Sequence, residues 1–134
     1  MPTSPIRVLI VDDSAAMRQL LTHILSSDPA IQVVGTAADP YFARDKIRDL
    51  KPDVLTLDVE MPRMDGFELT TALRAMPLYR DLPIVMLTSR SGEKHRAKAF
   101  SVGVTDYLVK PYQEEQLLTT IRNNVEKSRR LRAS

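Results

Sequence analysis

Short apolar runs alternate along the chain with segments that have helical periodicity. Five runs are almost continuously apolar and rich in Val, Ile and Leu: Ile6–Val11, Ile31–Gly35, Val54–Leu57, Ile84–Leu87 and Tyr107–Val109. Continuous apolar runs of this length are typical of strands that are buried on both faces. Each run is therefore predicted to be a strand inside a sheet that other elements cover.

The segments that follow the runs have the spacing of amphipathic helices. Apolar residues recur at intervals of three and four positions, to varying degrees, in segments 17–25, 42–50, 67–73, 97–102 and 117–125. Asp39 and Pro40 are typical of a helix start, and Gly103 is typical of a helix end. Five strand–helix units predict an α/β fold with a five-stranded parallel sheet and helices on both faces, because parallel strands need crossover connections.

Length and composition narrow the class of protein further. The chain has 134 residues, the size of one domain, and it contains no cysteine. Disulfides, thiolate zinc sites and cysteine nucleophiles are therefore excluded. No apolar run approaches the roughly 18–20 residues that span a bilayer, and residues 1–7 do not resemble a secretory signal. We expect a cytoplasmic protein that does not engage a membrane.

The basic residues are concentrated near the end of the chain. The formal net charge is +2, from 19 basic and 17 acidic residues. Residues 122–134 hold five of the basic residues and one of the acidic residues, so the rest of the chain is mildly acidic. A short basic segment is typical of a solvated helix end, and no nucleic-acid partner is expected. We predict one domain over residues 1–126, followed over 127–134 by a basic tail or helix extension.

Polar residues stand directly after four of the five predicted strands. Asp12 and Asp13 follow the first run, Asp58 the third, Thr88 the fourth and Lys110 the fifth. Ligands bind at the carboxyl ends of parallel strands, and three carboxylates repel one another unless a cation lies among them. Oxygen ligands favour Mg²⁺, and a hydroxyl and an ammonium beside it form a site for a phosphoryl group. Polar residues also gather at turns for no chemical reason, but that explains single residues better than the whole set.

The motifs that contain these residues resemble a response-regulator receiver domain. They are Asp12-Asp13, Leu55–Asp58 followed by Met61–Gly66, Thr88-Ser89 and Lys110-Pro111, and the resemblance covers residues 6–126. It implies a flavodoxin-like, doubly wound (βα)5 fold. The first half is similar to receivers of chemotaxis methylesterases, and the second half to receivers of chemotaxis-type hybrid kinases. No Gly-x-Ser-x-Gly occurs, so no esterase activity is expected, and the chain is expected to catalyse only its own phosphorylation and dephosphorylation.

The resemblance implies a role for each residue of the site. Asp58 is the implied phosphoacceptor, and the donor is a phosphohistidine on a histidine kinase or histidine phosphotransfer domain of a chemotaxis-like two-component system. The implied Mg²⁺ ligands are the carboxylates of Asp12, Asp13 and Asp58 and the backbone carbonyl of Glu60. Lys110 and Thr88 are expected to contact the phosphoryl group.

The resemblance also implies a switch that passes the signal to an output protein or domain. Thr88 is expected to move toward the phosphoryl group, and Tyr107 is expected to change position with it. The Lys110–Pro111 peptide is expected to be cis. Two long side chains of opposite charge, Glu60 and Arg90, are expected to border the path of the water that hydrolyses the phosphoryl group.

Other functions remain open at this point. An aspartyl-phosphate hydrolase of the haloacid-dehalogenase type also uses an acid at a strand end and Mg²⁺, and Glu60 stands where its second acid belongs, but the Asp12-Asp13 pair is then unexplained. A docking module that works without phosphorylation is expected to lack a site residue, and none is missing. A dinucleotide site is disfavoured, because the first strand–helix turn has no glycine fingerprint. His23 and His95 have no second ligand at i+4, so surface roles are favoured over metal binding.

Overall fold

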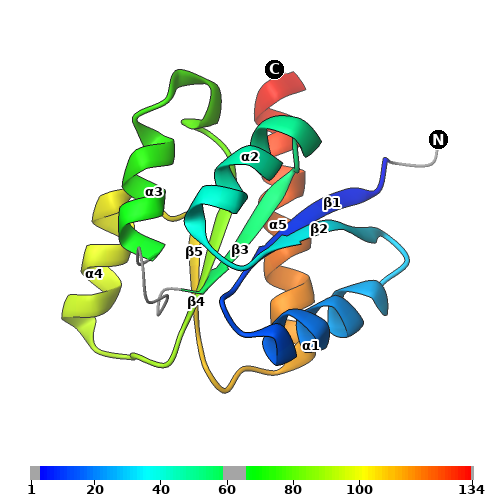
Figure 1. Cartoon of the computed structure of the whole chain (residues 1–134), viewed down its shortest axis with the longest axis horizontal. Coiled ribbons are helices and arrows are strands. Elements are labelled where there is room, and N and C mark those ends of the chain that lie inside the picture. The colour runs from blue at the N-terminus through cyan, green and yellow to red at the C-terminus, as the bar shows by residue number, and fades with distance from the viewer. Residues whose placement is uncertain (1–3, 59–65, 134) are drawn as a thin grey trace.

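The computed structural model describes residues 4–58 and 66–133, which are drawn with helices and strands in Figure 1. The elements in chain order are β1 (Ile6–Val11), α1 (Ala15–Ser26), β2 (Ile31–Ala37), α2 (Pro40–Leu50), β3 (Val54–Asp58), α3 (Gly66–Arg74), the 3₁₀ helix η1 (Pro77–Tyr79), β4 (Ile84–Thr88), α4 (Glu93–Val102), β5 (Asp106–Val109) and α5 (Glu114–Ala133). None of the helices within these residues is long and apolar enough to cross a membrane.

The five strands form one sheet in the order β2-β1-β3-β4-β5, and every neighbouring pair is parallel. The predicted α/β fold with a five-stranded parallel sheet is therefore confirmed. The chain places β2 on one side of β1 and the three later strands on the other, so the strand order reverses between β1 and β3. Ligands bind at such a reversal, and Asp12 and Asp58 stand there at the ends of β1 and β3.

Alternate residues of each strand enter two separate cores. Along β1, Ile6, Val8 and Ile10 face the core that α1 and α5 cover, and Leu9 and Val11 face the core that α2, α3 and α4 cover. Successive side chains of a strand point to opposite faces, so a continuous apolar run is what a strand covered on both sides requires. The result is three layers, with the helices on both faces of the sheet (Figure 1).

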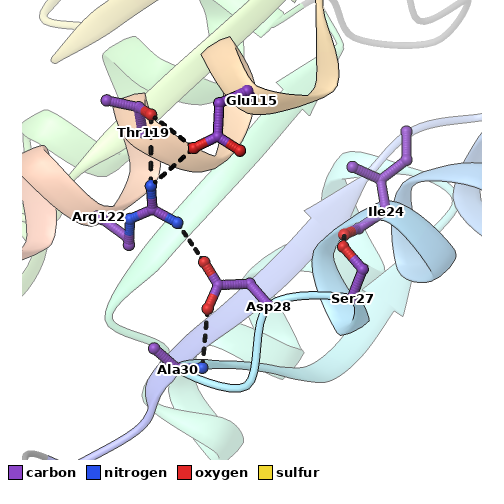
Figure 2. A network of polar contacts seen from close by, with 7 residues as sticks. All are labelled: Ile24, Ser27, Asp28, Ala30, Glu115, Thr119 and Arg122. Atoms are coloured by element: carbon purple, nitrogen blue, oxygen red, sulfur yellow. Dashed lines mark hydrogen bonds and ion pairs between the residues drawn. The ribbon is translucent and has the colours of Figure 1, made fainter.

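Helix α5 is tied to the turn between α1 and β2 by a network of charged groups. Figure 2 shows the Arg122 guanidinium between the carboxylates of Asp28 and Glu115. Arg122 Nη2 lies 3.1 Å from Glu115 Oε1. The Asp28 carboxylate also accepts the Ala30 N–H at 2.9 Å. That backbone hydrogen bond, and then Arg122, hold the pKa of Asp28 below its ordinary value against the opposing effect of burial. The network therefore holds the part of α5 around Arg122 against the turn between α1 and β2.

Replacing Arg122 by Met is expected to lower the free energy of unfolding by about 1–2 kcal/mol at neutral pH, because Asp28 then loses its cation in a largely buried position. The folded-state pKa of Asp28 lies below the ordinary 3.8. The ionised Asp28 therefore stabilises the folded state above pH 3.8, and this stabilisation is lost as the pH falls through the folded-state pKa. Urea unfolding of both proteins at several pH values measures the difference.

The matched control for that prediction is Arg48→Met. Arg48 pairs with Asp45 and Asp49 on the exposed side of α2, and its side chain is 65% exposed. Exposed pairs of this kind contribute little, so the control is expected to unfold as the parent does. A loss in Arg122→Met that stays the same from pH 7 into the acid range contradicts the assignment to the Asp28 pair.

Candidate functional site

Three predicted site residues come together at the carboxyl edge of the sheet. Carboxylate oxygens of Asp12, Asp13 and Asp58 all lie within 4.8 Å of one another. Asp12 is 1% exposed and Asp58 is 7% exposed, whereas Asp13 faces solvent. The structure thus places one negatively charged cluster, partly buried and open on one side, where the strand order reverses.

The start of α1 holds Asp12 in place. Asp12 Oδ1 accepts the Ser14 N–H at 2.9 Å, and Ser14 Oγ in turn accepts the Met17 N–H at 3.2 Å, so Ser14 caps the helix. The Arg18 guanidinium reaches back from the first turns of α1 to the Asp12 carbonyl at 2.8 Å. The carboxylate is therefore fixed by its own strand end and by the helix that follows.

The surroundings of Asp12 fit a bound divalent cation. Burial raises its pKa to about 6, the Ser14 N–H opposes that effect, and the charges of Asp58 and Asp13 add to it. Asp12 Oδ2 is buried and has no hydrogen-bond partner among the described residues. A buried carboxylate oxygen without a donor is costly unless a cation neutralises it. Carboxylate oxygens are also the ligands that Mg²⁺ prefers.

Lys110 reaches the same cluster from β5. Its Nζ lies 3.5 Å from Asp58 Oδ1, and the Lys110 side chain is about a quarter exposed. The Lys110 N–H donates to the Thr88 carbonyl at 2.7 Å, so the end of β5 is held against the end of β4. The Lys110–Pro111 peptide is cis. The Lys110 ammonium and the Asp58 carboxylate therefore share one corner of the site.

The two predicted switch residues are joined through the loop between β4 and α4. Thr88 is fully buried, and its Oγ1 accepts the Arg90 N–H at 3.1 Å. The Arg90 carbonyl accepts the Tyr107 hydroxyl, and the Tyr107 side chain is buried. Tyr107 therefore stands in an inward position here, bonded to the same residue that contacts Thr88.

One of the predicted site residues, Glu60, lies outside the described residues, as does the segment 61–65 of the motif. Arg90, its expected counterpart at the water path, is exposed in the loop after β4. The structure accordingly brings together Asp12, Asp13, Asp58 and Lys110, and separately links Thr88, Arg90 and Tyr107.

His95, for which a surface role is favoured over metal binding, also contacts one of the predicted switch residues. Its ring is partly buried, and Nε2 lies 3.3 Å from Thr88 Oγ1. The other histidine, His23, is exposed on α1, as expected. The sequence carries no signal for the His95 contact, because α4 is mostly polar and the two residues meet only when α4 packs beside β4 and β5.

The comparisons with known proteins agree with this geometry. Residues 8–122 match the response regulator receiver domain family. Over 110 residues the chain is 54% identical to protein-glutamate methylesterase/protein-glutamine glutaminase 1 of Xanthomonas campestris pv. campestris, a match covering 81% of this chain and 30% of that protein. The chain thus spans about a third of the length of the curated relatives it matches, and the similarity to methylesterase receivers extends beyond its first half.

Solved structures give the same assignment. The response regulator domain of Thermotoga maritima CheB aligns with a TM-score of 0.81 and 34% identity, over 91% of this chain and 97% of that one. Vibrio cholerae chemotaxis protein CheY4 aligns with a TM-score of 0.82 and 38% identity, over 90% of this chain and 98% of that one. Together with the acidic cluster and its lysine, these matches show that the chain belongs to the response regulator receiver domain family and is of the chemotaxis type.

Proposed function

We propose that the chain is a phospho-accepting switch of a chemotaxis-like two-component system, with Asp58 as the phosphoacceptor. The observation that carries the proposal is the position of the Asp58 carboxylate, among the carboxylates of Asp12 and Asp13 and 3.5 Å from Lys110 Nζ. A carboxylate that attacks an anionic phosphoryl group needs cations beside it. Lys110 supplies one positive charge beside Asp58, and the acidic cluster offers a place for a metal cation.

The proposed donor is a phosphohistidine on a histidine kinase or histidine phosphotransfer domain. A carboxylate oxygen of Asp58 attacks phosphorus, the P–N bond to the donor breaks, and the imidazole nitrogen leaves with the bonding electron pair. The signal ends by hydrolysis. A water oxygen attacks phosphorus, the bond between phosphorus and the Asp58 oxygen breaks, and inorganic phosphate leaves while the Asp58 carboxylate is restored. No catalysis is proposed beyond these two reactions of the chain's own aspartate.

The carboxylates of Asp12, Asp13 and Asp58 and the Glu60 backbone carbonyl are the proposed holders of Mg²⁺. When bound, Mg²⁺ supplies positive charge against the phosphoryl oxygens. Lys110 contributes its ammonium to one of these oxygens and keeps Asp58 oriented. Glu60 and Arg90 are proposed to border the path of the hydrolytic water.

The proposed output is a shift between two conformations. The phosphoryl group draws the Thr88 hydroxyl toward Asp58, and the loop that joins Thr88 to Tyr107 through Arg90 moves with it. An output protein or domain reads the altered surface around α4 and β5. A haloacid-dehalogenase-type hydrolase is not favoured, since the receiver family matches residues 8–122. A docking module independent of phosphorylation is not favoured, since the acidic cluster and Lys110 stand together at the site.

Acetyl phosphate with Mg²⁺ tests the proposal directly. We expect intact mass spectrometry to show one added phosphoryl group on the parent chain and none on Asp58→Asn, because an amide cannot form the acyl phosphate. Asp45→Asn is the control, since Asp45 is exposed on α2. A phosphoryl group that still appears on Asp58→Asn, or fails to appear on the parent, rejects Asp58 as the acceptor.

A further inference from the structure

His95 is only partly exposed on α4 and contacts both switch residues, Thr88 and Tyr107. It stands in the first turn of the helix, and its Nε2 lies 3.3 Å from Thr88 Oγ1 on β4. Its ring also packs edge-on against two aromatic rings, Phe67 of α3 at 5.0 Å and Tyr107 of β5 at 5.9 Å between centroids. One side chain therefore contacts three elements around the buried threonine.

The contacts with Arg90 and His95 hold the threonine hydroxyl from the α4 side. Two partners of Thr88 Oγ1, the Arg90 N–H and the His95 ring, belong to the loop and helix that follow β4. The rings of Phe67 and Tyr107 limit how far the imidazole can turn away from Thr88, because edge-to-face aromatic pairs prefer a defined orientation. The hydroxyl is thus held toward α4 by a side chain that is itself held in place.

We infer that His95 is a positioning residue of the switch, which holds the Thr88 hydroxyl on the α4 side so that a phosphoryl group on Asp58 must compete with it. This inference rests on the proposed function. A hydrogen bond that stabilises one conformation reduces the population of the other, and so lowers the apparent affinity of any ligand that binds only the other conformation. Removing the His95 hydrogen bond should therefore favour the phosphorylated state.

The test uses beryllofluoride, a phosphoryl mimic, in the presence of Mg²⁺. His95→Phe keeps an aromatic ring between Phe67 and Tyr107 but removes Nε2. We expect it to bind beryllofluoride about threefold to tenfold more tightly than the parent, which is the effect of one hydrogen bond of ordinary strength. His95→Gln, whose amide can still reach a hydroxyl, is expected to return the affinity toward that of the parent.

Two controls separate positioning from a general effect on the fold. His23→Phe changes the other histidine, which is exposed on α1, and is expected to bind as the parent does. Affinity for Mg²⁺ alone is expected to be equal in all variants, since the proposed holders of Mg²⁺ do not include His95. A merely structural role for His95 predicts the opposite sign, with weaker binding and a lower melting temperature.

A measurement on the parent protein needs no substitution. The chain has two histidines, so ¹⁵N NMR resolves His95 and His23 separately. Adding beryllofluoride with Mg²⁺ should shift the His95 Nε2 signal and leave His23 unchanged. An unshifted Nε2, or binding by His95→Phe that is equal to or weaker than that of the parent, overturns the inference. Failure of the parent to bind beryllofluoride at all rejects the proposed function instead.

Discussion

Replacing Asp12 by Asn should stabilise the metal-free protein and abolish its Mg²⁺-dependent phosphorylation. Asp12 is 1% exposed, and burial raises its pKa to about 6 from an ordinary 3.8. At neutral pH the folded protein therefore holds a buried charge that water solvates better in the unfolded chain. An amide of the same shape removes that cost, and it also removes a ligand of the proposed cation.

The size and the pH dependence of this stabilisation both follow from the raised pKa of Asp12. Two units of raised pKa correspond to about 2–3 kcal/mol at neutral pH, or roughly 5–10 °C in melting temperature for a domain of this length. Because the folded-state pKa is raised, the folded protein binds more protons than the unfolded chain between about pH 4 and 6. The stability of the metal-free parent should therefore fall as the pH rises through this window and stay low above it.

Thermal unfolding in a chelator, repeated from pH 4 to pH 7.5, measures this effect. Asp12→Asn should show a flatter pH dependence than the parent and a higher melting temperature at pH 7. The control is Asp13→Asn, whose exposed carboxylate has much less to gain. If Asp12→Asn melts below the parent at pH 7, the carboxylate is a structural acceptor for the Ser14 N–H rather than a strained ligand.

Replacing Gly103 by Val should cost roughly 3 kcal/mol or more of the free energy of unfolding. Gly103 ends α4 with φ at +110°, a region that side chains other than glycine's rarely adopt. A Cβ there lies 2.8 Å from the Arg74 Cγ and 3.1 Å from its Nε. Backbone strain and the collision act together, and each alone is worth about 1–3 kcal/mol.

The collision matters because the Arg74 side chain joins separate parts of the chain. Its Nε donates to the Gly103 carbonyl at 2.8 Å and its Nη1 to the Tyr79 carbonyl at 2.8 Å. Burial lowers the pKa of Arg74, so a displaced guanidinium leaves a charge without its acceptors in a partly buried place.

Urea unfolding of the variant measures the loss, and the chain supplies a matched control. Gly92 also flanks α4, but it has an ordinary φ of −65°, and a Cβ there meets nothing within 4 Å. Gly92 is the N-cap of α4, where valine is a poorer cap than glycine, so Gly92→Val should lose only about 1 kcal/mol. Comparable losses in both variants contradict the argument from strain and collision at Gly103.

The sheet could be predicted from the sequence because burial on both faces leaves a continuous apolar run. β1 was predicted to the residue, and the runs for β3 and β4 each stop one residue before the strand does. Asp58 and Thr88 are those last residues, and they are polar because they belong to the site. The acidic cluster could also be predicted, because parallel strands bring their carboxyl ends to one edge of the sheet.

Elements with one buried face, or with little burial, could not be predicted in full. β2 is an edge strand that continues through Thr36 to Ala37, beyond its apolar run. α4 begins at Glu93, four residues before its predicted start, because Ala99 is its only fully buried residue among those described. α5 continues to Ala133 through basic residues without an apolar period.

Contacts between elements were not predictable from local pattern at all. Arg18 reaches the Asp12 carbonyl, and His95 reaches Thr88, from helices whose polar residues otherwise face solvent. Each contact depends on how a helix lies on the sheet, which a single sequence does not encode in its spacing. The chemistry of the site could therefore be predicted from strand ends, whereas the residues that position it could not.

The position of β1 has a consequence for synthesis on the ribosome. β1 lies between β2 and β3 in the finished sheet, yet it is made first, and 16 residues separate the end of β2 at Ala37 from the start of β3 at Val54. Translation at roughly 5–20 residues per second takes about 1–3 s over that distance. During that time β1 is an edge strand of the nascent chain, with one row of backbone groups unpaired. A strand that is paired on both sides in the mature sheet is therefore open to wrong pairing while the chain emerges.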